Sequence, residues 1–315
     1  MKTRIWVALL AVYIVWGSTY LAIRFAVESM PPFLMAATRF LVAGTILYVG
    51  ARLGGAAKPE RRHWRPAAIM GLFLLLGGNG LVAWAEQRVV SSVTALMIGA
   101  TPLWIVLVDA LRPGGRRPAL RTLIGVLIGL AGIVLLIGPA SLFGEEESIN
   151  LWGALALVAA ALSWAIGSIF GREKQNELPE APLLATSMEM LAGGAGLLVF
   201  GSFMGEWGRL DVNAITTRSL LGLAYLIAFG SLVGFAAYTW LLRVAPTPLV
   251  STYAYVNPLV AVFLGNVFAQ EPLTLRILLA AAVILSSVVL INTSRLSPPQ
   301  PKVILAEARC SEGVD

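Results

Sequence analysis

The amino-acid sequence predicts an all-α integral membrane protein with ten transmembrane helices, arranged as two inverted-topology repeats of five. Three observations support this: an apolar composition, ten long apolar runs, and a motif that occurs twice. Apolar residues make up 58% of the 315 residues and charged residues only 13%, against roughly 45–50% and 25% in soluble domains. The mean hydropathy is +0.81. A water-soluble fold of this length could not bury so much apolar side chain, so most of the chain must lie in lipid.

Most of the ten apolar runs are close to the ~20 residues that a helix needs to cross the hydrocarbon core. Helices are required because lipid cannot hydrogen-bond to open backbone groups, and the runs do not alternate as the strands of a membrane barrel would. The first run is too long for a signal-peptide core and lacks a cleavage site, so we expect it to be retained. The predicted spans are Ile5–Ile23, Phe33–Ala51, Pro66–Ala85, Val89–Val108, Thr122–Ile137, Leu151–Phe170, Pro182–Met204, Leu220–Leu242, Leu249–Ala269 and Leu275–Asn292.

The repeated motif begins at Trp16 and again at Trp164. Each tryptophan is followed eight residues later by an arginine, Arg24 or Arg172, and further matches follow, such as Trp84 with Trp240. Because five spans is an odd number, the second unit must enter the membrane from the opposite side, which makes the repeat inverted, as in many secondary transporters. We therefore divide the chain into repeats at 1–143 and 144–294, with a disordered cytoplasmic tail at 295–315.

Basic residues predict the orientation of the chain. The side that holds both termini carries 17 of the 23 lysines and arginines, whereas the other side carries Glu145, Glu146 and Glu147. By the positive-inside rule, both termini are cytoplasmic. This distribution explains the net charge of +6, so we expect no nucleic-acid partner. We expect the protein to lie in a bacterial inner membrane and to act as a monomer.

Two charged residues lie inside predicted spans at matched positions of the repeat, Arg39 in the second span and Glu189 in the seventh. A charge at the bilayer centre costs on the order of 2.5–3.5 kcal/mol, so such residues usually face a cavity or a partner. One interpretation is that they line a polar pathway or take part in coupling. The other is that each caps a helix or pairs locally. Glu86 and Asp109 lie near span ends, where we expect solvated loops.

Pro102 and Pro258 each interrupt a predicted span and are candidate hinges. Each removes a helical hydrogen bond, which frees the carbonyl groups of Ile98 and Ala254. The neighbouring Thr101 and Asn257 could satisfy those groups. The alternative is an ordinary kink, which is common in membrane helices. Two kinks at equivalent places would instead create broken helices at the midplane, where many transporters bind substrate.

Aromatic and neutral polar side chains concentrate in the first, third, eighth and ninth spans. Such side chains could line a cavity for an amphipathic solute. Some tryptophans near span ends, such as Trp6, Trp64 and Trp152, fit interfacial anchors instead. The candidate substrate-binding residues are Trp16, Ser18, Asn79, Trp84, Trp164, Tyr253 and Asn257.

Motifs of enzymes and nucleotide-driven pumps are absent from the sequence. It contains no HExxH, G-x-S-x-G or Walker A pattern. One histidine, His63, and one cysteine, Cys310, cannot form a His/Cys metal site, and a single cysteine excludes an internal disulfide. We therefore expect no catalytic residues, no metal and no cofactor, and transport that follows gradients of a small-molecule substrate across membrane lipid.

Several stretches resemble the EamA-type exporters of the drug/metabolite transporter superfamily. These are Trp16-Gly17-Ser18-Thr19-Tyr20, the stretch from Pro32 to Arg39, and Tyr255-Val256-Asn257-Pro258 followed by Glu271. The resemblance covers about residues 5–292. It implies ten helices, cytoplasmic termini, alternating access and export of small metabolites such as amino acids. The first span lacks the buried glutamate of the small four-helix multidrug members, which argues against proton-coupled cation export.

Three functional hypotheses follow. The first is a secondary exporter of small amphipathic metabolites, with amino acids as the leading candidates. The second is a proton-coupled multidrug antiporter that uses Glu189, since an antiporter needs a carboxylate in the membrane. The third is a membrane receptor or scaffold that moves no solute.

Overall fold

The computed structural model describes residues 2–115, 117–138 and 149–295. All regular structure in these ranges is helical, as predicted. Nine helical segments of the described chain are long and apolar enough to cross a membrane, and the shorter apolar helix Tyr253–Ala269 supplies the tenth. The predicted acidic run at 145–147 and almost all of the predicted disordered tail lie outside the described residues.

Six of the spans are single helices. Their bounds agree with the predicted spans to within three residues at either end, because long apolar runs define helices well. They are α1 (Lys2–Ala26), α2 (Pro32–Leu53), α7 (Leu120–Ile137), α9 (Leu151–Glu173), α10 (Pro182–Phe203) and α15 (Leu275–Arg295).

The other four spans are interrupted. The third and eighth contain a π-helical segment and the fourth and ninth are broken. Their parts are α3 (Arg61–Gly71), η1 (Leu72–Gly80) and α4 (Leu81–Ala85); α5 (Ser91–Gly99) and α6 (Thr101–Leu111); α11 (Thr217–Tyr225), η5 (Leu226–Val233) and α12 (Gly234–Val244); and α13 (Thr247–Val250) and α14 (Tyr253–Ala269).

The π-helical segments η1 and η5 lie in spans that the predicted repeat pairs with each other. In η1, the Asn79 amide Nδ2 donates to the Leu74 carbonyl at 3.2 Å. In η5, the Ser231 hydroxyl accepts from Arg39 Nε of α2 at 3.0 Å. Single π turns inside helices often mark functional sites. Asn79 and Arg39 thus each stabilise one of the two irregular segments.

The breaks in the fourth and ninth spans differ in their relation to the prolines. In the fourth span Pro102 lies in the first turn of α6, just after the break at Ala100. The Thr101 hydroxyl donates to the Ile98 carbonyl at 2.5 Å, as the sequence suggested. In the ninth span α14 continues through Pro258, and the break falls earlier, at Ser251 and Thr252. The hinge role of both prolines stays a prediction.

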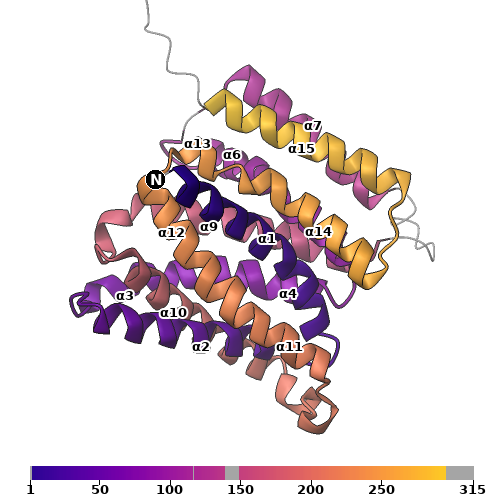
Figure 1. Cartoon of the computed structure of the whole chain (residues 1–315). Coiled ribbons are helices and arrows are strands. Elements are labelled where there is room, and N and C mark those ends of the chain that lie inside the picture. The colour runs from indigo at the N-terminus through magenta and orange to yellow at the C-terminus, as the bar shows by residue number, and fades with distance from the viewer. Residues whose placement is uncertain (1, 116, 139–148, 296–315) are drawn as a thin grey trace, which may run out of the picture.

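Two helix pairs stand on opposite sides of the bundle, α2 with α10 and α7 with α15 (Figure 1). Between them, α1 packs on α11, α12 and α14, while α9 packs on η1, α4 and α6. Glycines permit the closest approaches. A Cβ on Gly132 of α7 would lie 2.8 Å from Ile284 of α15, and one on Gly125 would lie 2.8 Å from Ile291. Small residues on α7 thus let it pack closely against α15.

Candidate transport pathway

The helical bundle has two ends: α1 begins at the near end and stops at the far end. Successive spans alternate between these ends. The far end therefore holds the start of α5, the start of α9 and the end of α14.

Trp16 of α1 lies in an aromatic group that joins three spans. Its ring centroid is 5.4 Å from that of Phe235, 4.9 Å from that of Tyr238 and 5.4 Å from that of Tyr253. Its indole Nε1 donates to the Gly230 carbonyl of η5 at 3.2 Å. The edge-to-face and tilted arrangements are those that aromatic quadrupoles favour. Two predicted substrate contacts, Trp16 and Tyr253, are thus direct neighbours.

Hydroxyl groups border this aromatic group. The Ser18 hydroxyl donates to the Val15 carbonyl at 2.9 Å and lies 2.6 Å from the Tyr225 hydroxyl. Tyr13 and Thr252 are joined through their hydroxyl groups, which links α1 to the break before α14. These neutral groups can offer hydrogen bonds without adding charge.

Asn257 lies where α14 meets both α1 and α5. A Cβ on Gly17 would be 3.1 Å from the Asn257 carbonyl oxygen, and a Cβ on Gly99 of α5 would be 2.6 Å from Pro258. The side chain of Asn257 is buried, and its Oδ1 has no hydrogen-bond partner among the described residues. It does not bond the Ala254 carbonyl in the way that Thr101 bonds Ile98. Its buried amide oxygen therefore has acceptor capacity to spare.

The remaining candidates lie on the side of η1 and α9. A Cβ on Gly78 of η1 would be 2.8 Å from the Trp164 ring, and the Ser163 hydroxyl donates to the Phe73 carbonyl at 2.7 Å. Trp84 stacks under the Arg88 guanidinium at 3.8 Å. The seven predicted contacts thus divide into Trp16, Ser18, Tyr253 and Asn257 around α1 and α14, and Asn79, Trp84 and Trp164 around η1 and α9.

Arg39 and Glu189 have different surroundings. Arg39 is buried, bonds Ser231 and lies 4.7 Å from the Phe40 ring centroid. Glu189 of α10 is half-buried and takes part in none of the ion pairs within the described chain. Their role in a polar pathway stays a prediction.

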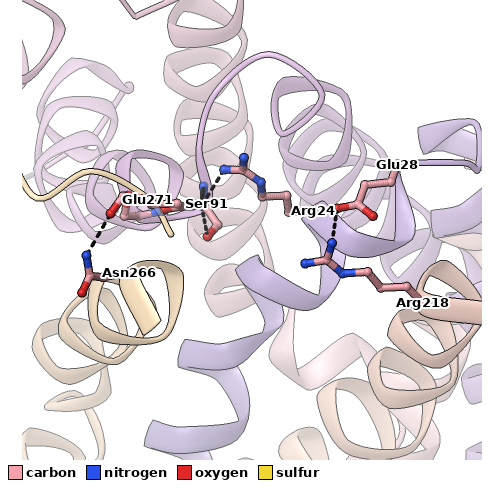
Figure 2. Close-up of polar contacts among 7 residues, drawn as sticks. Arg24, Glu28, Ser91, Arg218, Asn266 and Glu271 are labelled. Carbon is pink, nitrogen blue, oxygen red and sulfur yellow. Dashed lines mark hydrogen bonds and ion pairs between the residues drawn. The ribbon is translucent and has the colours of Figure 1, made fainter. Parts of the chain in front are cut away.

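At the far end, Glu271 ties three spans together (Figure 2). Its carboxylate accepts from the Ser91 backbone N–H and hydroxyl at 2.9 and 2.7 Å and from the Ser92 N–H at 2.9 Å. It also forms an ion pair with Arg24 of α1 at 2.6 Å. The glutamate therefore caps the N-terminus of α5, where the helix dipole favours a negative charge.

The cap also shifts the pKa of Glu271, which lies between α14 and α15, outside the spans. Burial raises this pKa, but the hydrogen bonds from Ser92 and Ser91 outweigh burial and hold it below the ordinary value of 4.5. The sequence pointed to Glu271 only through the family resemblance. No local signal could show that it reaches Ser91, which is 180 residues away.

Glu86 does not lie in a solvated loop. The sequence suggested a solvated loop, but the residue is only 5% exposed, and neither carboxylate oxygen has a hydrogen-bond partner among the described residues. Burial, followed by the charge of Glu271, raises its pKa well above 4.5, against the opposing effect of Arg24. Glu86 also lines a far-end pocket of about 480 Å³ with Arg24, Glu28 and Arg88. The expectation failed because the short loop after α4 packs under α1.

A second ionic cluster lies at the near end. Asp109 of α6 pairs with Arg112 at 2.8 Å and with Arg172 of α9 at 3.6 Å, and Arg112 also pairs with Glu173. Asp109 is thus not fully solvated, since its side chain is 19% exposed. Arg24 and Arg172 occupy matched positions of the repeated motif. The two arginines therefore form ion pairs at opposite ends of the bundle.

These features define a polytopic helical membrane protein. The described residues contain no group of three or more His, Cys, Asp or Glu side chains that could hold a metal ion. The chain belongs to the EamA-like transporter family, whose family model matches residues 3–138 and again residues 151–293.

Its relatives include the uncharacterized inner membrane transporter YedA of Escherichia coli (strain K12), which is 39% identical over 94% of this chain and 93% of YedA. A WAT1-related chloroplastic protein of Arabidopsis thaliana is 26% identical over 91% of this chain and 69% of its own length. A solved structure with a TM-score of 0.61 and 20% identity covers 92% of this chain and 96% of its own. At that identity the likeness concerns the fold alone.

Proposed function

We propose that this protein is a secondary transporter that exports small amphipathic metabolites, with amino acids as the leading candidates, from the bacterial cytoplasm by alternating access. The membership of the EamA-like family and the likeness to an inner membrane transporter support the general class. The near end is the cytoplasmic end in this proposal, because the lysines and arginines of the connecting segments gather there.

Two ion pairs at opposite ends of the bundle support alternating access. Repeat-matched arginines hold ion pairs at opposite ends, Arg24 with Glu271 at the far end and Arg172 with Asp109 at the near end. The far-end pair joins α1 to the segment after α14, and the near-end pair joins α9 to α6. Opening one end requires the pair at that end to separate while the other pair holds. This is the behaviour expected of two repeats that rock against each other.

The chemistry of the aromatic group supports the substrate class. Trp16, Tyr238 and Tyr253 present aromatic faces, and the Ser18 hydroxyl and the buried Asn257 amide add neutral hydrogen-bonding groups. An amphipathic solute can use both kinds of contact, whereas a bare metal ion cannot. Amino acids with apolar side chains fit this description.

The test is counterflow of labelled amino acids into proteoliposomes that contain the purified protein. Uptake should occur for at least one apolar amino acid, and Trp16→Ala should reduce it at least tenfold. Trp152→Ala is the matched control, because Trp152 is 72% exposed at the start of α9. Equal loss in both variants, or no flux of any amino acid in the wild type, would overturn the substrate class.

The alternative of a proton-coupled multidrug antiporter depends on Glu189, a half-buried carboxylate inside α10. If Glu189→Gln changed neither cationic drug efflux nor its dependence on pH, this alternative would be rejected. A receptor or scaffold that moves no solute would show no change in flux in any of these variants.

A further inference from the structure

Glu86 is a buried carboxyl group that has no role in the proposed transport pathway. Its two oxygens are each less than 1 Å² exposed and have no hydrogen-bond partner within the described residues. By contrast, the carboxylate of Glu271 is held by three hydrogen bonds and an arginine. An ionised carboxylate without such partners is far more costly to bury than a neutral carboxylic acid.

Charged and titratable groups of α1, of α2 and of the segment before α15 surround Glu86. Tyr20 and Arg24 of α1, Arg39 of α2 and Glu271 before α15 interact electrostatically with it. Glu28 and Arg88 line the same pocket. The cation that acts most strongly on Glu86, Arg24, forms an ion pair with Glu271 at 2.6 Å. While that pair is formed, its charge is already balanced.

A proton is the ligand that fits this site. A metal ion needs several oxygen ligands, and no cluster of metal-binding side chains exists in the described chain. An organic ammonium group would have to reach oxygens that are almost completely covered. A proton needs neither a coordination shell nor space. We propose that Glu86 is a proton-binding site whose occupancy is linked to the far-end ion pair between Arg24 and Glu271.

The linkage follows from the position of Arg24. When the far end is closed, Arg24 pairs with Glu271 and Glu86 holds a proton on its carboxyl group. When the far end opens, Arg24 separates from Glu271, and both its charge and water can stabilise the Glu86 carboxylate. The O–H bond of Glu86 then breaks and the proton passes to water in the far-end pocket. The reverse step takes a proton from the same water. One proton is exchanged in each opening and closing cycle.

The coupling part of this inference rests on the proposed transport function, whereas the protonation of Glu86 does not. The first experiment therefore measures protonation directly, by infrared spectroscopy of the purified protein labelled with ¹³C-glutamate. At neutral pH the wild type should show a protonated carboxyl band that is absent in Glu86→Gln. Glu28→Gln should keep this band, because Glu28 is a partly exposed carboxylate at the same pocket that pairs with Arg218.

If Glu86→Gln does not fold, Glu189→Gln and the double variant Arg24→Gln/Glu189→Gln give the decision. A protonated glutamate band that remains without Glu189 should titrate at a different pH once Arg24 is removed, because Arg24 is the cation that acts most strongly on Glu86. Identical spectra for the wild type and Glu86→Gln, or no protonated glutamate band in Glu189→Gln, would overturn the proposal. Arg24→Gln should change the pH at which the Glu86 band titrates, and an unchanged titration would overturn the linkage.

The second experiment measures counterflow while the pH on the far-end side is varied. The wild-type rate should depend on that pH, and Glu86→Gln should transport with at least a threefold weaker dependence. Unchanged pH dependence in Glu86→Gln would overturn the coupling. A wild type that moves no solute would instead count against the proposed function, and the infrared result would still decide whether Glu86 binds a proton.

Discussion

Glu271 and Glu86, which are both buried at the far end, differ in how their oxygens are satisfied, and this difference gives them opposite properties. Hydrogen bonds from Ser91 and Ser92 fix Glu271 as a charged cap on α5. Glu86 has no such donors. Both side chains are acidic and both lie next to Arg24, so their chemistry is decided by local donors rather than by residue type.

At this scale, Glu271→Gln should destabilise the protein by about 2–3 kcal/mol at neutral pH, because it removes charge-assisted hydrogen bonds and leaves Arg24 unpaired. The folded-state pKa of Glu271 is below 4.5. Its contribution is therefore present above pH 4.5 and is lost as pH falls through the folded-state pKa. Unfolding in mild detergent at a series of pH values checks this. A gap between wild type and variant that stayed constant into strong acid would contradict it.

Glu86→Gln should behave in the opposite way. The pKa of Glu86 is raised above 4.5, so its contribution to stability is present below pH 4.5 and is lost as pH rises, by about 1.4 kcal/mol per unit up to the folded-state pKa. The variant should therefore gain stability relative to the wild type in alkaline solution. Melting temperatures of both proteins across the same pH range measure this. Parallel curves would show that Glu86 does not titrate differently on folding.

At the scale of elements, the crossing of α1 and α14 depends on a small residue. A Cβ on Gly17 would lie 2.6 Å from Val260 Cβ and 3.1 Å from the Asn257 carbonyl oxygen. No real Cβ sits so close, so the two helices would have to move apart. This crossing also positions Trp16 and Asn257, which links helix packing to the proposed pathway.

Gly17→Ala should therefore cost about 1–3 kcal/mol through overpacking and reduce counterflow. Gly50→Ala is the matched control in α2, where an added Cβ meets nothing within 4 Å, and it should stabilise the helix by roughly 0.5–1 kcal/mol. Thermal unfolding and counterflow of both variants test this. If the two substitutions had equal effects, the crossing would not be the limiting contact.

At the scale of the whole molecule, the two ends differ in the strength of their ion pairs. Glu271 is almost fully buried in its pair with Arg24, whereas Arg172 is 58% exposed and 3.6 Å from Asp109. Buried, hydrogen-bonded pairs lose more when one partner is removed than exposed pairs do. The far-end pair should therefore control the balance between the two access states more strongly.

Arg24→Gln should shift this balance toward the state open at the far end by about tenfold, since 1.4 kcal/mol corresponds to a factor of ten. Arg172→Gln should shift it less and in the opposite direction. A cysteine at Ser18 in a Cys310→Ser background can be labelled by an impermeant maleimide from the far-end side. Labelling should be faster in Arg24→Gln and slower in Arg172→Gln. Unchanged labelling in Arg24→Gln would contradict the gating role of the far-end pair.

The number of membrane spans and the approximate bounds of their helices could be predicted from the amino-acid sequence. Apolar runs of the right length define membrane helices because lipid enforces backbone hydrogen bonding within each segment. The same reasoning found Arg39 and, in the aromatic group, Trp16 and Tyr253, since polar and aromatic side chains stand out inside apolar spans. It also anticipated the bond between Thr101 and Ile98, which is local.

Contacts between distant segments determine which of these residues meet and how the far-end carboxyl groups are paired. The contacts among Arg24, Glu271 and Ser91 join segments up to 247 residues apart. The burial of Glu86 depends on helix α1, which packs over the short loop after α4. Periodicity describes one helix at a time and says nothing of its neighbours. Hydrogen bonds and desolvation, which set the charge of a carboxyl group, come from those neighbours.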